Sequence, residues 1–193
     1  MKRKEPGKRL PQKKKAANDP SSKNKGRTKR NAENSERNQA LFPVVAIGAS
    51  AGGIEAISTL LENLSPRLGM AYVIIQHLAP NHESILPELL ERKAKMPVHQ
   101  VENNMHMLPN NVYVIPPNTY MGIEDSTLKL SPRVKTDGSF HSIDFFLKSL
   151  ASVYKHKAIA IILSGSASDG TLGIQYIKAE GGITFAQDGS AKF

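Results

Sequence analysis

From residue 41 to the end, the chain alternates short apolar runs with amphipathic stretches. Uninterrupted apolar runs predict strands buried on both faces of a sheet, and an apolar repeat of about 3.6 residues predicts helices. The predicted strands are 42–48, 71–76, 98–101, 112–115, 158–163 and 183–186, with 127–130 as a minor hairpin arm. The predicted helices are 52–64, 83–93, 143–154 and 171–180, and Gly181-Gly182 predicts a left-handed end to the last one.

Strands that alternate with helices predict βα units on a parallel sheet. We therefore expect a three-layer, mostly parallel, doubly wound α/β fold of the Rossmann-like class. In such sheets ligands bind beyond the carboxyl ends of the strands. The residues that follow the three most apolar strands are consequently the first candidates for chemistry.

Those three strand ends carry a hydroxyl, an imidazole and a carboxylate. Ser50 follows the first strand within Gly48-Ala49-Ser50-Ala51-Gly52, which fits the G-x-S-x-G nucleophile elbow. His77 follows the second strand, and Asp169 lies in the Gly/Ser-rich segment after the third. These are the groups that acyl transfer by a hydroxyl nucleophile requires, with the serine at a helix N-terminus where free amides stabilise an oxyanion.

Small residues around the candidate serine predict an oxyanion and substrate pocket. Ala51 supplies the first amide donor, and Gly52 gives a substrate carbonyl room to approach. A second donor is expected near Gly165 or Ser166. No metal or cofactor is needed for this chemistry, and no H-x-x-x-H pair indicates a metal hydrolase.

Simpler interpretations of the same residues remain open. The glycine-rich segment also fits a phosphate-binding loop or a tight βα turn, although Ser50 replaces the second Gly of G-x-G-x-x-G and His77 stands where a ribose-binding acid is expected. Asp169 also fits an N-cap for the helix that begins near Thr171.

Positive charge is concentrated in residues 1–40, with 14 Lys and Arg against 4 Asp and Glu, a net of +10. Residues 41–193 hold 12 against 13, a net of −1. We expect a disordered basic tail over 1–40, either a solubilising extension or a contact for nucleic acid or another anionic surface, and one domain over 41–193.

Several absences narrow the functional classes. No run of about 20 apolar residues predicts a transmembrane helix, and no apolar segment behind the N-terminal charges predicts a secretory signal. The chain has no Cys, so disulfides and thiolate chemistry are excluded, and a cytoplasmic location is expected. With no Trp and 6% aromatic residues, a stacking platform for single-stranded nucleic acid is not expected.

The combination of motifs resembles the catalytic domain of CheB-type chemoreceptor methylesterases. The resemblance is carried by 44–53, Gln76-His77, Ser142-Ile143-Asp144, Ser164-Gly165 and Asp169-Gly170, in family order. It implies a Ser50, His77 and Asp169 triad that hydrolyses glutamate γ-methyl esters on methyl-accepting chemotaxis receptors and releases methanol. It also implies that receptor glutamines are deamidated in some members.

The chain departs from the family pattern at four places. No receiver domain precedes the catalytic domain, so phosphorylation control within this chain is not expected. Ser166-Ala167 stands where many members have Met-Gly, and Phe140-His141 where Arg-Pro is common. The family usually continues beyond residue 193, so we expect a truncated domain or the opening piece of a fusion with a CheR-type methyltransferase.

Other functional classes also fit the sequence. One is a catalytically silent module that docks receptors or a methyltransferase. The others are a nucleotide-binding α/β domain and a nucleic-acid binder that uses the basic tail.

Overall fold

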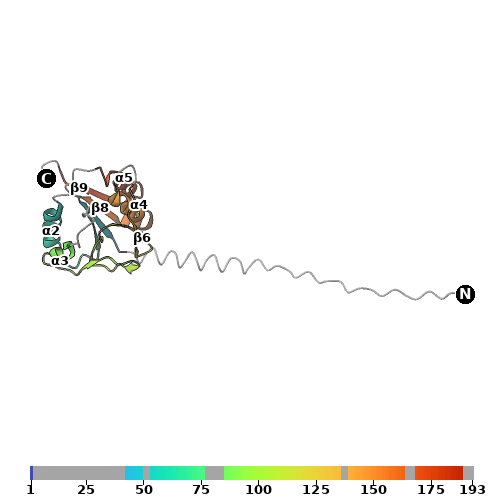
Figure 1. The fold of residues 1–193 in the computed structure, drawn as a ribbon, viewed down its shortest axis with the longest axis horizontal. Coiled ribbons are helices and arrows are strands. Elements are labelled where there is room, and N and C mark those ends of the chain that lie inside the picture. Colours follow the sequence, from blue (N-terminus) through green and yellow to red (C-terminus); the bar gives the residue numbers. More distant parts are fainter. Residues whose placement is uncertain (2–41, 50–52, 77–84, 136–138, 164–167, 189–193) are drawn as a thin grey trace. The chain divides into compact units, whose positions relative to one another are not determined.

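The structure is a computed structural model that describes residues 1, 42–49, 53–76, 85–135, 139–163 and 168–188 (Figure 1). Its main sheet has six strands, all in parallel pairs. In spatial order they are β3 (Val98–Gln100), β5 (Val112–Val114), β2 (Ala71–Gln76), β1 (Val44–Ala49), β8 (Ala158–Ile162) and β9 (Ile183–Ala186). The predicted parallel α/β sheet is therefore confirmed.

Helices cover both faces of this sheet, which gives the predicted three layers (Figure 1). They are α2 (Gly53–Asn63), α3 (Leu86–Glu91), α4 (Ser142–Tyr154) and α5 (Thr171–Ala179), with a 3₁₀ turn η1 (Lys155–Lys157) after α4. Among the described residues α3 is shorter than predicted, since it begins at Leu86 and ends at Glu91. Gly181 has φ +79°, which confirms the left-handed end after α5.

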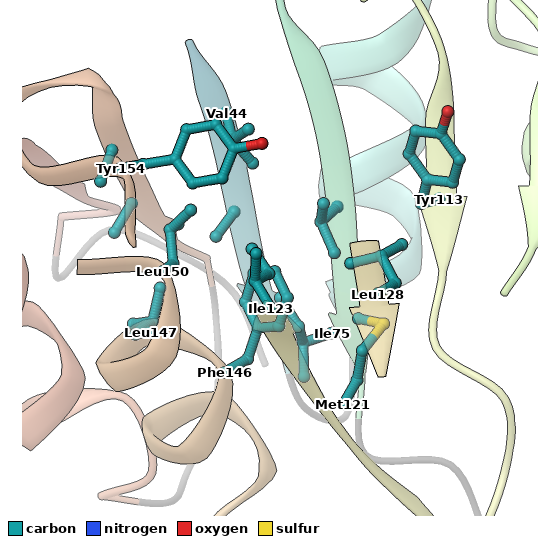
Figure 2. Packing of buried hydrophobic residues seen from close by; sticks show 14 of the residues in the cluster. Val44, Ile75, Tyr113, Met121, Ile123, Leu128, Phe146, Leu147, Leu150 and Tyr154 are labelled. Carbon is teal, nitrogen blue, oxygen red and sulfur yellow. The ribbon is translucent and has the colours of Figure 1, made fainter. Parts of the chain in front are cut away.

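Each face of the sheet has its own hydrophobic core, because successive strand residues point to opposite faces. Val45 and Ile47 of β1 pack in one core with Ile57 of α2, and this core also includes α3. Val44 of β1 belongs to the other core, where Phe146 and its neighbours on α4 point toward the sheet (Figure 2). The central strands thus become inaccessible to water, as their continuous apolar sequence predicts.

A second sheet, of three antiparallel strands, is the largest departure from the prediction. It has the order β4 (Met105–His106), β7 (Thr127–Pro132) and β6 (Thr119–Glu124), whereas the sequence indicated only a minor arm at 127–130. Gly122 interrupts the apolar sequence of β6, and it faces α4: a Cβ there would lie 3.5 Å from Phe145 of α4, an ordinary van der Waals distance. The small sheet therefore packs on α4 and adds Met121, Ile123 and Leu128 to the same core (Figure 2).

None of the helices within the described ranges is long and apolar enough to cross a membrane.

Candidate active site

Three neighbouring strands end together at one edge of the main sheet. β1 lies between β2 and β8, and the register pairs Ala49 with Gln76 and Gly48 with Ile162. The carboxyl ends of β2, β1 and β8 are therefore adjacent. From β1 the chain first continues to β2 on one side and later returns to β8 on the other side, so the strand order reverses at β1. Crevices at such switch points are the usual ligand sites of open α/β sheets.

The predicted site residues follow these strand ends in the chain. Of them, Asp169 is described by the structure. Outside the described residues lie Ser50, Ala51, Gly52, His77, Gly165 and Ser166. Their predicted roles stay predictions.

Asp169 is buried, with 8% of its surface exposed, and both of its carboxylate oxygens accept backbone hydrogen bonds. The Ile143 amide donates to Oδ2 at 3.0 Å and the Asp144 amide donates to Oδ1 at 2.9 Å. Both donors belong to the first turn of α4, where helix amides have no partner within the helix and the positive end of the dipole favours an anion. The carboxylate is thus held in one orientation by charge-assisted hydrogen bonds.

Asp144 makes the complementary contacts from α4 to α5. Its Oδ1 accepts the Gly170 amide at 2.9 Å and the Gly173 amide at 2.7 Å. The first turn of α4 is therefore capped by Asp169, which lies just before α5, and the first turn of α5 is capped by Asp144 of α4. The alternative interpretation of Asp169 as the N-cap of the helix at Thr171 is wrong, because Gly170 is the N-cap of α5 and its amide donates to the carboxylate of Asp144.

Gly170 allows the chain to turn immediately after Asp169. Its φ of +103° lies in the left-handed region, which favours glycine. A Cβ at this position would also lie 2.9 Å from Cδ1 of Ile162, the last residue of β8. The turn is consequently tight against the sheet, and this brings the Asp169 carboxylate to the first turn of α4.

His141, Asp144 and Asp169 form a cluster whose potential ligand atoms lie within 4.8 Å of one another. His141 Nδ1 lies 4.0 Å from Asp144 Oδ2. A cation here would compete with the backbone amides that already donate to three of the four carboxylate oxygens. The arrangement is that of reciprocal helix caps, and it does not indicate a metal centre.

A pair of cations lies beside the N-terminal end of α4. The Arg133 guanidinium lies 3.9 Å from the centroid of the Phe140 ring, and Lys135 Nζ lies 5.5 Å from the same centroid. Burial lowers the pKa of Arg133, while the negative charge of Asp169 acts in the opposite direction. Arg133 is therefore close enough to Asp169 to feel its field.

Asp144 and Arg133 are the site residues that sequence reasoning missed. Asp144 was placed in a predicted helix and in the Ser142-Ile143-Asp144 segment that carries the family resemblance, but it was given no role in the site, although an acid in the first turn of a helix is a recognisable N-terminal signal. The sequence does not reveal which amides Asp144 caps, because they lie 26 and 29 residues further along the chain. Arg133 had no signal, because its contacts to Phe140 and the field of Asp169 arise only from the tertiary structure.

Comparison with known proteins gives consistent results at several levels. The profile of the CheB methylesterase family matches residues 45–193. A putative protein-glutamate methylesterase/protein-glutamine glutaminase of Leptospira interrogans is 34% identical over 148 residues, which cover 76% of this chain and 77% of that protein. The protein-glutamate methylesterase/protein-glutamine glutaminase of Thermotoga maritima is 30% identical over 149 residues, and the match covers 75% of this chain but 43% of that protein.

The fold agrees with a solved structure of the same kind. The crystal structure of the Thermotoga maritima CheB methylesterase catalytic domain superposes with a TM-score of 0.72 at 28% identity, covering 78% of this chain and 82% of that one. Sequence profile, relatives and fold therefore agree, and this chain belongs to the CheB methylesterase family.

Proposed function

We propose that this protein is a protein-glutamate methylesterase that hydrolyses glutamate γ-methyl esters on chemotaxis receptors. One observation carries the proposal: the adjacent carboxyl ends of β2, β1 and β8, with the Asp169 carboxylate fixed in place by the amides of α4. Ser50 and His77 follow in the chain directly after Ala49 and Gln76, which are partners in the sheet register. The names of the relatives support the same substrate class.

In the proposed reaction, His77 takes the proton of Ser50 as the serine oxygen attacks the ester carbonyl. Asp169 orients the imidazole and stabilises its charged form; a carboxylate that accepts one amide on each oxygen still has lone pairs for an imidazole N–H. Amides at Ala51 and near Gly165 or Ser166 stabilise the oxyanion.

The methoxide leaves with the proton from His77 as methanol. Water then hydrolyses the glutamyl-serine ester, which releases a glutamate carboxylate and regenerates the serine.

Deamidation of protein glutamine is a second activity that fits the same site. The relatives are named for both activities. The chemistry differs only in the leaving group, since ammonia replaces methanol while the acyl-enzyme and the glutamate product are the same.

The proposed setting is the cytoplasm, with methyl-accepting chemotaxis receptors as substrates. A CheR-type methyltransferase, fused or separate, is the proposed functional partner because it would supply the ester that this domain removes. The segment 1–40, with its net charge of +10, is proposed to contact anionic surfaces.

Methanol release from a methylated receptor tests the proposal. Ser50→Ala should lower turnover by about a thousandfold or more, because the nucleophile is lost. Ser65→Ala is the matched control: this serine is exposed after α2 and accepts a hydrogen bond from the Arg67 amide at 3.4 Å, so its loss should leave turnover unchanged. Methanol release by Ser50→Ala at the wild-type rate would contradict the proposed nucleophile.

A further inference from the structure

Arg133 is placed by the small sheet and not by a free loop. Its amide donates to the Asn118 carbonyl at 3.2 Å, and the Tyr120 hydroxyl donates to the Val134 carbonyl at 2.6 Å. Both partners belong to β6 or directly precede it. The backbone at 133–134 is thus tied to β6, which packs on α4.

The side chain of Arg133 is oriented by an aromatic ring. With its guanidinium carbon 3.9 Å from the Phe140 centroid, the charge lies over the ring face, a geometry that stabilises arginine and fixes its plane. Phe140 lies two residues before α4, whose first amides hold Asp169. Lys135 Nζ lies 5.5 Å from the same ring, so two positive charges lie beside the proposed active site.

This cation has no carboxylate partner within the described part of the chain. No ion pair of 4.0 Å or less joins Arg133 to a described acid, and its Nε is buried without a hydrogen-bond partner. Guanidinium groups that lose water are normally paired, because desolvation of an unpaired charge is costly. The surrounding 41–193 region has a net charge of −1, so this local positive charge is not part of a generally basic surface.

We propose that Arg133, supported by Lys135 and Phe140, is a carboxylate-binding subsite that holds an acidic side chain of the substrate polypeptide next to the esterified glutamate. The inference rests on the proposed function. A methyl ester is neutral and offers no charge for recognition, whereas the carboxylate of an acidic residue beside it would be anionic. The planar guanidinium matches a carboxylate with two parallel N–H···O bonds, which gives orientation as well as attraction.

Binding of a product-like peptide tests the subsite without requiring catalysis. The probe is a fluorescein-labelled helical peptide with four glutamates, compared with the same peptide carrying serines, and anisotropy is measured with the full chain. Arg133→Gln should weaken binding of the glutamate peptide about two- to fivefold, the range for an exposed ion pair, and leave the serine peptide unaffected. Arg133→Lys should retain part of the affinity, because it keeps the charge but loses the fork.

Arg92→Gln is the matched control, since Arg92 is an exposed arginine after α3. The basic segment 1–40 is present in every variant, so its attraction for the peptide cancels in the comparison. Equal affinities for Arg133→Gln and Arg92→Gln would overturn the proposal.

Kinetics on a methylated receptor separates this role from an effect on the triad. Arg133→Gln should raise KM about two- to fivefold with kcat unchanged, because a contact made equally in the ground and transition states is removed. A fall in kcat at constant KM would overturn the subsite, because it would mean that Arg133 acts on the reaction through the charge of Asp169 and not by binding the substrate. If the wild-type chain releases no methanol, the proposed function fails, while the peptide comparison still decides the subsite.

Discussion

Replacing Asp144 with alanine tests the reciprocal capping of α4 and α5. The substitution removes one carboxylate oxygen that accepts two backbone amides, at 2.9 Å from Gly170 and 2.7 Å from Gly173. The side chain is only 13% exposed, so water replaces these bonds incompletely. A lost N-cap costs about 1 kcal/mol and a buried amide left unpaired costs about 1–3 kcal/mol. We therefore expect Asp144→Ala to lower the free energy of unfolding by about 2–3 kcal/mol.

Asparagine separates the hydrogen bonds from the charge at this position. Asp144→Asn keeps an oxygen that accepts both amides and loses only the interaction of the negative charge with the helix dipole, which amounts to about 0.3–1 kcal/mol. For a domain of this size, 1 kcal/mol corresponds to about 2–4 °C in Tm, so the alanine variant should melt about 5–10 °C lower and the asparagine variant about 1–4 °C lower.

Urea and thermal denaturation of the full chain measure these differences. Glu55→Ala is the control, because Glu55 is an exposed acid in the first turn of α2 and its loss should change stability by less than about 0.5 kcal/mol. The same network fixes Asp169, so Asp144→Ala should also reduce kcat more than it raises KM, and asparagine should restore most of the loss. Equal stability of the alanine and Glu55→Ala variants would refute the capping argument.

Three further changes test other parts of the structure. Gly173→Ala should lower the free energy of unfolding in urea by about 1–3 kcal/mol, because the new Cβ would lie 2.6 Å from Cβ of Leu147. Alanine by itself favours helices, so a stabilised variant would contradict the close packing of α4 on α5. Burial raises the Tyr154 pKa above 10.0, so the stability that is present below pH 10 is lost as the pH rises and the unfolded chain releases this proton. Tyr154→Phe should therefore reduce the loss of stability at alkaline pH. An unchanged dependence of stability on pH above 10 would refute this argument. Asp169→Asn should lower kcat for methanol release about a thousandfold or more while keeping one acceptor for the α4 amides, and wild-type kcat would remove Asp169 from the proposed triad.

The main sheet was predictable because its strands carry their structural signal locally. Val44 to Ala49 and Ala71 to Gln76 are apolar on both faces, and such runs in a βα pattern fit only a sheet covered by two helix layers. Parallel pairing then follows from the crossover helices, and the edge for chemistry follows from the strand direction. The position of Asp169 at this edge was thus available from sequence order alone.

The small sheet was not predictable in the same way. β6 contains Gly122 and polar residues at its ends, so its pattern is weak, and its stability comes from packing on α4. One such contact is specific: the Ile123 amide donates to the Ser149 hydroxyl at 3.1 Å. Propensity is a weak guide wherever a strand depends on a helix that is distant in the sequence.

The environment of the candidate acid shows why residue types were easier to predict than their roles. A carboxylate in a glycine-rich segment before a helix is equally suited to capping that helix or to serving a catalytic histidine. The structure decides against the first option, since Asp169 bonds the amides of α4 and Asp144 bonds those of α5. Because of these reciprocal contacts, the orientation of the Asp169 carboxylate depends on how α4 and α5 pack on one another. In the proposed enzyme, substitutions at the α4–α5 contact should therefore change turnover and stability together, even where they touch no substrate.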